Sequence, residues 1–212
     1  MDTRLRKWIR WLDIIQKEIY QLVIYRDIFW SFQELIKNNK RIQKQSIFYR
    51  FLSDSYVSCI LMGIRRQTKI SQQSISFSRL LFEIANDPKR VSRKYYKSLY
   101  KGSVVEKFAD KHFDKFCDTD PDHISAKMVT NDLIELKKAV NKCEEFSDKR
   151  IAHRDKKDPK KLPKFNDIDL CIDTLDKLYC KYHLIFHASS MQSLTPTYQY
   201  DWQKIFDVPW RN

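Results

Sequence analysis

One ten-residue segment, from Phe146 to Asp155, gathers side chains with which a protein can handle phosphate. It reads Phe-Ser-Asp-Lys-Arg-Ile-Ala-His-Arg-Asp. A histidine imidazole can serve as a general base or a general acid, and His153 supplies one. Arg150 and Arg154 carry permanent charge and forked donors that bind phosphate oxygens. We therefore take His153, Arg150 and Arg154 as the candidate catalytic residues of a site that acts on a phosphodiester.

Further cations can add charge to the same site. Arg65 and Arg66 are adjacent near the end of a predicted helix, and a favourable position at the negative end of the helix dipole does not explain both. Lys149, Lys156 and Lys157 lie within the segment or directly after it. We predict these five residues as the nucleic-acid-binding side chains.

Two local arrangements of the histidine are compatible with the sequence. In a helix, residues three apart share a face, so Arg150 and His153 could approach the same phosphate. Alternatively, His153 completes a buried polar network at a helix end, with Asp148 or Asp155 as its partner. The first arrangement makes the segment a site, and the second makes it a structural feature.

Three other motifs resemble chemical sites but fail on spacing. The tripeptide 153–155 matches a kinase catalytic loop, yet Lys160 stands where that loop requires asparagine. The aspartates of 118–129 resemble a calcium loop without its glycine and its final glutamate. His183 and His187 are four apart, a spacing that can chelate a metal, but no third ligand is evident. We predict no metal and no cofactor.

The composition favours an all-helical protein. Only two glycines, Gly63 and Gly102, occur in 212 residues. Tight hairpins and phosphate-cradling loops need glycine, so the sequence argues against a β-barrel, a P-loop or a Rossmann fingerprint. With 42% hydrophobic residues the chain can bury a sizeable core. We predict a single all-α domain that covers residues 1–212.

The formal net charge of +13 is concentrated in residues 37–50, 86–101 and 149–164. Clustered positive charge attracts polyanions. A solvated lysine-rich surface is the equally weighted alternative. In residues 90–101, tyrosines alternate with Lys and Arg as on a nucleic-acid-facing surface, or else belong to an amphipathic helix with half-buried rings.

Nothing in the sequence points to export or to a membrane. The five cysteines lie far apart and include no C-x-x-C pair, as expected of reduced thiols. Charged residues interrupt the apolar amino-terminal stretch, unlike a signal peptide. No uncharged apolar run reaches the roughly 18–20 residues of a membrane span. We predict a cytoplasmic protein.

Apolar residues recurring at spacings of three and four predict four long helices, near residues 3–36, 47–69, 121–148 and 166–187. The first is apolar over a wide surface, which predicts contact with two neighbouring helices or with a second protomer. Smaller helices fill residues 76–116, the first of them capped by Ser74 or Ser76.

The boundaries of the later helices come from capping patterns. Asp120 as N-cap and Pro121 as the first residue start the third long helix. Asn166 or Asp167 starts the fourth. The carboxy-terminal aromatic tail, which ends with Pro209 and Trp210, is expected to dock across the bundle.

The phrase Asp148 to Asp155 resembles the signature of HEPN-type helical bundles, particularly their abortive-infection branch. Residues 62–84 and 196–210 share the resemblance, and the order of the three stretches matches. The resemblance implies an α-helical bundle of four to five main helices, often dimeric, in prokaryotic defence or toxin–antitoxin settings. It also implies that active relatives cut RNA without metal, using an arginine and a histidine separated by four to six residues and often paired across a dimer.

The sequence departs from that pattern at the arginine. Counted back from His153, the arginine should occupy position 146, 147 or 148, where Phe146, Ser147 and Asp148 stand. Three interpretations follow: a metal-independent endoribonuclease, an RNA- or nucleotide-binding protein without cleavage, and a non-catalytic dimeric interaction or scaffold module. The expected partners are RNA, a second copy of the chain, and an antitoxin or a nucleotidyltransferase-like protein.

Overall fold

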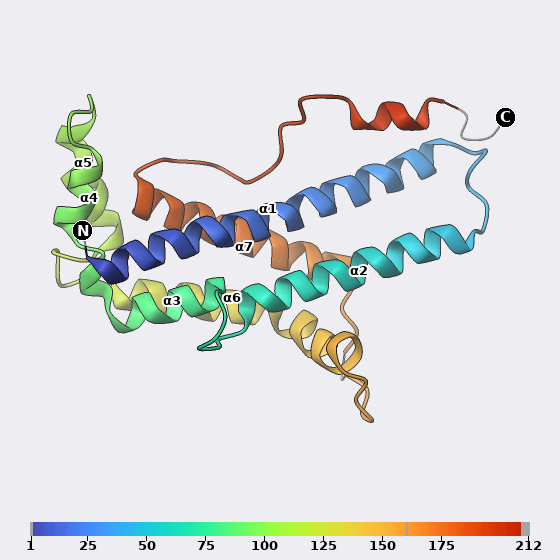
Figure 1. The fold of residues 1–212 in the computed structure, drawn as a ribbon, viewed down its shortest axis with the longest axis horizontal. Coiled ribbons are helices and arrows are strands. Elements are labelled where there is room, and N and C mark those ends of the chain that lie inside the picture. The colour runs from blue at the N-terminus through green and yellow to red at the C-terminus, as the bar shows by residue number, and fades with distance from the viewer. Residues whose placement is uncertain (1, 160, 209–212) are drawn as a thin grey trace.

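The protein is a bundle of helices, and the computed structural model describes its residues 2–159 and 161–208 (Figure 1). The described residues contain no strand, only one isolated bridge between Ser92 and His123. The predicted all-α helical bundle is therefore confirmed. Four long helices form its body: α1 (Thr3–Asn38), α2 (Ile47–Thr68), α6 (Ala126–Phe146) and α7 (Phe165–His187).

Shorter helices cover one end of the bundle and extend one of its sides (Figure 1). They are α3 (Phe77–Asn86), α4 (Arg93–Leu99) and α5 (Ala109–Phe113). A π-helix, Ser147–Ala152, continues directly from α6. Short 3₁₀ turns lie at Pro88–Arg90, Glu106–Phe108, Asp114–Phe116 and Trp202–Phe206.

The buried apolar side chains form one connected cluster to which all the long helices contribute. Helix α1 packs on α2, α3 and α7, while α6 packs on α2, α3 and α7. The wide apolar surface predicted for α1 is thus largely covered within the same chain. Its buried residues Leu5, Trp8, Leu12, Ile15, Ile19 and Leu22 follow the predicted three-four spacing, Phe29 continues it after one gap at Arg26, and Val23 is buried beside them.

Gly63 on α2 lies in close contact with α1. A Cβ atom added at Gly63 would lie 2.5 Å from Cδ2 of Leu22. Both residues are buried. The helix therefore tolerates the low helix propensity of glycine because the packing there requires it.

Helix α6 begins five residues later than predicted, because Asp120 and Pro121 are not its cap. Ser125 is the N-cap, and its Oγ accepts a hydrogen bond from the Met128 N–H at 3.0 Å. The Asp120 carboxylate instead closes a turn by accepting the Asp122 N–H at 2.9 Å. Residues 122–125 then pair with distant backbone groups, which keeps them extended. These bonds run from Arg93 N to Asp122 O, Ile124 N to Val91 O, and Ser125 N to Phe116 O.

Two other capping predictions can be compared with the structure. Ser76, one of the two predicted candidates, caps α3 by accepting the Arg79 N–H at 3.1 Å. Helix α7 starts at Phe165 with Lys164 as N-cap, so the prediction of Asn166 or Asp167 as its start is wrong. Asp167 is the third helical residue, and its carboxylate accepts the Lys164 N–H at 2.9 Å.

The tyrosines of α4 point toward the protein interior. Tyr96 is fully buried, and Tyr95 donates to the Phe186 carbonyl at 2.6 Å. A base could not stack on rings held in this way. The amphipathic alternative for residues 90–101 is therefore the correct one, and the nucleic-acid-facing interpretation is wrong.

The carboxy-terminal tail runs beside α1, as Figure 1 shows. Asp176 on α7 anchors its beginning, accepting the Leu194 N–H at 2.8 Å and the Ser193 hydroxyl at 2.6 Å. Further along, the Tyr198 hydroxyl donates to Asp27 on α1 at 2.7 Å. The tail is therefore docked on the bundle, while Pro209 and Trp210 lie outside the described residues.

Candidate functional site

The segment from Phe146 to Asp155 begins where α6 changes into the π-helix. The side chain of Ser147 is fully buried at this junction. Its hydroxyl lies 2.7 Å from the Cys143 carbonyl, one turn back, and 3.3 Å from the Leu61 carbonyl on α2. A π-helix is rare and often lies at a functional site. Here its first residue is held against the backbone of a second long helix.

An ion-pair cluster fixes the next residue, Asp148, to the end of α2. Its carboxylate accepts from Arg65 Nε at 2.5 Å and from Lys69 Nζ at 2.8 Å. Glu144 also pairs with Lys69, at 3.0 Å. Burial raises the pKa of the Asp148 carboxyl, but the hydrogen bonds from Lys69 and Arg65 outweigh burial and hold that pKa below its usual value. The family pattern expects an arginine at position 146, 147 or 148. Here an arginine side chain does lie at residue 148, but it belongs to Arg65 of α2.

His153 lies outside the helix and is exposed. The π-helix ends at Ala152, and His153 has extended backbone angles, φ −138° and ψ 155°. The predicted shared helical face of Arg150 and His153 is therefore wrong, because the histidine is not helical. The predicted buried network is wrong too: Asp148 pairs with Arg65 and Lys69, and His153 makes no hydrogen bond or ion pair among the described residues.

His153 is distinguished from the other four histidines by this lack of a polar partner. Nδ1 of His112 lies 2.6 Å from the Tyr96 hydroxyl, and Nε2 of His123 lies 3.1 Å from Asp120. Nδ1 of His183 lies 3.0 Å from the Ser189 carbonyl, and His187 lies 3.6 Å from Asp13. Within the described part of the chain, only the imidazole of His153 has both nitrogens free to meet a ligand.

Arg150 closes the segment into a loop. One of its terminal nitrogens, Nη1, donates to the Asp155 carbonyl at 2.9 Å and, at 3.4 Å, to the Lys149 carbonyl. The other, Nη2, forms an ion pair with the carboxylate of Asp158. The Asp155 N–H donates in turn to the Lys149 carbonyl at 3.0 Å. His153 therefore sits on a loop whose two ends are joined.

The predicted cationic residues divide into two groups. Arg65, Arg66 and Lys149 each pair with a carboxylate, on Asp148, Glu18 and Glu145 respectively. Arg154, Lys156 and Lys157 are exposed and have no carboxylate partner among the described residues. The charge available to a polyanion near His153 thus comes from the loop itself.

The structure reveals two site residues that the sequence did not suggest. Glu144 and Asp148 both form ion pairs with Lys69, and the carboxylate of Asp158 forms an ion pair with the guanidinium of Arg150. The four-residue spacing of Glu144 and Asp148, one helical turn, was a usable signal for the first. For Asp158, eight residues after Arg150 in a proline-marked loop, no local signal exists.

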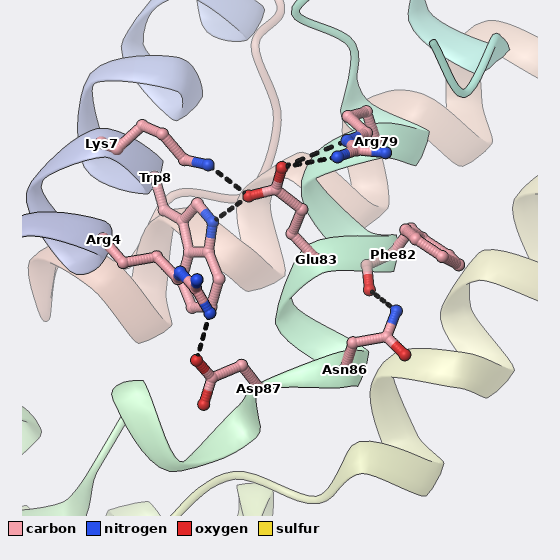
Figure 2. A pocket seen from close by; sticks show the side chains of 8 residues that line it. All are labelled: Arg4, Lys7, Trp8, Arg79, Phe82, Glu83, Asn86 and Asp87. Atoms are coloured by element: carbon pink, nitrogen blue, oxygen red, sulfur yellow. Dashed lines mark hydrogen bonds and ion pairs between the residues drawn. The ribbon is translucent and has the colours of Figure 1, made fainter. Parts of the chain in front are cut away.

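A pocket of about 350 Å³ lies elsewhere, between the start of α1 and α3 (Figure 2). Lys7, Trp8 and Arg79 converge there on the carboxylate of Glu83, as Figure 2 shows, with Lys7 Nζ at 2.5 Å and Trp8 Nε1 at 2.8 Å. Arg4 pairs with Asp87 at 2.5 Å. The carboxylates of Glu83 and Asp87 are thus already paired with the cations that line the pocket. These ion pairs join the start of α1 to α3 and the residue that follows it. It shares no lining residue with the loop that bears His153.

No group of three or more His, Cys, Asp or Glu side chains within residues 2–159 and 161–208 is arranged to bind a metal ion. Among these residues α2 alone has the length and apolar composition of a membrane span, a property shared by core helices of soluble proteins.

Comparison with known proteins places the chain in one family. The AbiU2 model of the HEPN group matches residues 5–205, nearly the whole chain. No curated protein and no solved structure matches it. The match covers the bundle, the π-helix and the loop with His153. The protein accordingly belongs to the AbiU2 family, an abortive-infection-associated family of HEPN domains.

Proposed function

We propose that this defence-type HEPN protein binds RNA at the loop bearing His153 and cleaves it without metal. The observation that carries the proposal is the exposed, unpartnered imidazole of His153 beside the unpaired cations Arg154, Lys156 and Lys157. Each of the other four histidines has a polar partner within the fold, whereas the imidazole of His153 is left open to a ligand. Family membership supports the defence setting.

The chemistry requires two proton transfers. A base takes the proton of the RNA 2′-hydroxyl, the 2′-oxygen attacks phosphorus, and an acid protonates the departing 5′-oxygen. His153 can serve as either group but not as both in one step. A second copy of the chain would supply the second histidine, so the proposed enzyme is a homodimer. Arg150 and Arg154 would stabilise the negative charge that builds up on the phosphorane.

The decisive variant is His153→Ala. Because the side chain is exposed and unpartnered, the variant should fold as the wild type does. We expect RNA cleavage in the presence of a chelator to slow by on the order of 10²–10⁴-fold, the usual contribution of a general acid or base. Cleavage of structured and unstructured RNA, followed on gels, measures this, and circular dichroism verifies folding.

A matched pair of cation variants tests RNA binding. Arg154→Ala should weaken binding at low salt, whereas Lys137→Ala, which removes an exposed unpaired cation on α6, should have little effect. If wild-type protein binds RNA but leaves it intact, the catalytic half of the proposal is wrong. If it neither cuts nor binds RNA at low salt, the whole proposal fails.

A second candidate function, a non-catalytic dimeric interaction module, is favoured by the exposed first half of α2. Ile47 is 86% exposed and Phe51 62% exposed. Arg50 and Asp54 lie beside them on the same helix and are paired at 3.7 Å. In an antiparallel α2–α2 contact, each of these charges could pair across the two-fold axis, so the face is complementary to a second copy of itself.

The variant Phe51→Glu tests this surface against a matched control. It should convert a dimer to a monomer in light scattering, whereas Phe108→Glu, which changes a 55% exposed phenylalanine near α5, should not. If the wild type is monomeric, the dimeric module is ruled out. An antitoxin or a nucleotidyltransferase-like protein is the proposed partner of the dimer, to be sought by pull-down with wild-type protein.

A further inference from the structure

The guanidinium of Arg150 resembles an anion-binding site that is already occupied, because it is paired with a carboxylate of the same loop. Its side chain is only 20% exposed, and the carbonyls of Asp155 and Lys149 hold Nη1. Nη2 faces outward to the carboxylate of Asp158, whose side chain is 85% exposed. The guanidinium is thus fixed on one side by backbone groups. On the other side it contacts a carboxylate from the loop's own sequence.

We propose that the Asp158 carboxylate occupies the place of an RNA phosphodiester and gates the site until RNA displaces it. This inference rests on the proposed function and deepens it by naming the group that RNA must replace. Asp158 carries one negative charge and presents it to Nη2 of Arg150, a donor that a phosphate oxygen could also accept from. The protein therefore carries its own competitor for Arg150, the cation that closes the loop bearing His153.

The exposure of the two partners makes the exchange physically reasonable. An ion pair with one largely exposed partner contributes little net stability, so Asp158 can leave at low cost. Arg150 would stay in place, because its carbonyl contacts do not involve Asp158. A polynucleotide also attracts Arg154, Lys156 and Lys157, which Asp158 leaves unpaired. RNA thus gains interactions that the internal carboxylate cannot make.

The rest of the loop limits how far Asp158 can move. The Asp155 N–H is bonded to the Lys149 carbonyl, and Pro159, directly after Asp158, is buried. Opening therefore involves the short segment between these two points. The π-helix and the backbone of His153 lie before it and keep their positions.

The test compares Asp158→Asn with Asp155→Asn. Both remove one negative charge from the same exposed loop, but the Asp155 side chain has no ion pair among the described residues. The probe is a single-stranded uridine oligonucleotide at low salt. We expect Asp158→Asn to tighten its binding by about fivefold, which corresponds to the upper end of the free energies of exposed ion pairs. We expect Asp155→Asn to tighten binding by clearly less. In an Arg150→Ala background the difference between the two substitutions should vanish.

An RNA-free measurement separates the two levels of the proposal. In protein with ¹⁵N-labelled arginine, rotation of the Arg150 guanidinium should be restricted in the wild type and in Asp155→Asn, and faster in Asp158→Asn. Equal effects of both substitutions on RNA binding, or free rotation in the wild type, would overturn the gate while leaving RNA binding intact. If no variant binds RNA, the proposed function fails and the phosphodiester ligand with it.

Discussion

At the scale of single residues, the site was only partly readable from the sequence. His153 could be selected because histidine is rare in this chain and chemically specific, and its flanking cations could be selected because they cluster around it in the sequence. Which cations remain free could not be predicted, because Arg65 and Arg66 are paired by carboxylates whose approach depends on tertiary structure. The prediction that Asp148 would contact the histidine failed for the same reason: α2 brings Arg65 closer.

The ion-pair cluster at Asp148 leads to a pH-dependent stability prediction. The folded-state pKa of Asp148 is lowered, so its contribution is present above the unfolded pKa of about 3.9 and is lost as pH falls through the folded value. At pH 7 we expect Asp148→Asn to reduce the free energy of unfolding by about 1 kcal/mol, discounted for the partial exposure of the pairs. Urea titrations that show the same deficit at pH 3 as at pH 7 would contradict this assignment.

At the scale of elements, the long helices were predictable and their ends were less so. Repeating apolar residues located α1, α2 and α7 to within a residue or two of their observed bounds. The start of α6 was missed because the Asp-Pro sequence at 120–121 also suits a turn, and backbone pairing with Val91 and Phe116 decided the outcome. The π-helix was not predictable, since π-helices are rare and this one continues directly from α6.

Gly63 supplies a prediction about how α1 and α2 pack. In Gly63→Ala the new methyl group meets the buried side chain of Leu22. We expect a loss of about 1–3 kcal/mol from overpacking, partly offset by the roughly 1 kcal/mol better helix propensity of alanine. The double variant Gly63→Ala with Leu22→Ala should lose less stability than the two single losses added together. Thermal or urea unfolding of the four proteins completes the cycle, and strict additivity would argue against the contact.

At the scale of the whole molecule, a single core and a docked tail give the chain its form. The tail position was expected from its aromatic residues, but its anchor was not. The anchor is Asp176, a buried carboxylate that accepts hydrogen bonds from the Leu194 N–H and the Ser193 hydroxyl. Aspartate in the middle of a helix is normally read as surface, so only the folded contacts reveal its role.

Removing that anchor should release the tail. Asp176→Ala leaves the Leu194 N–H and the Ser193 hydroxyl without their acceptor, at a cost of about 1–3 kcal/mol. We expect faster chymotrypsin cleavage at Tyr198 and Tyr200 in this variant. Asp173→Asn, which alters an exposed pair with Arg26, is the control and should not change the cleavage rate. Unchanged proteolysis in Asp176→Ala would mean that the contacts with α1 suffice to hold the tail.

The π-helix has a consequence for how length variation would act on this protein. A π turn contains one residue more than an α-helical turn over the same hydrogen-bonded stretch. A single-residue deletion within Ser147–Ala152 could therefore restore an α-helix without breaking the chain's hydrogen bonding. Because the π turn already accommodates its extra residue, such a deletion would leave His153 near its present direction, whereas a deletion within α6 would rotate everything after it by about 100° around the helix axis. In this protein, losing one codon within the π-helix should therefore disturb His153 less than losing one codon within α6.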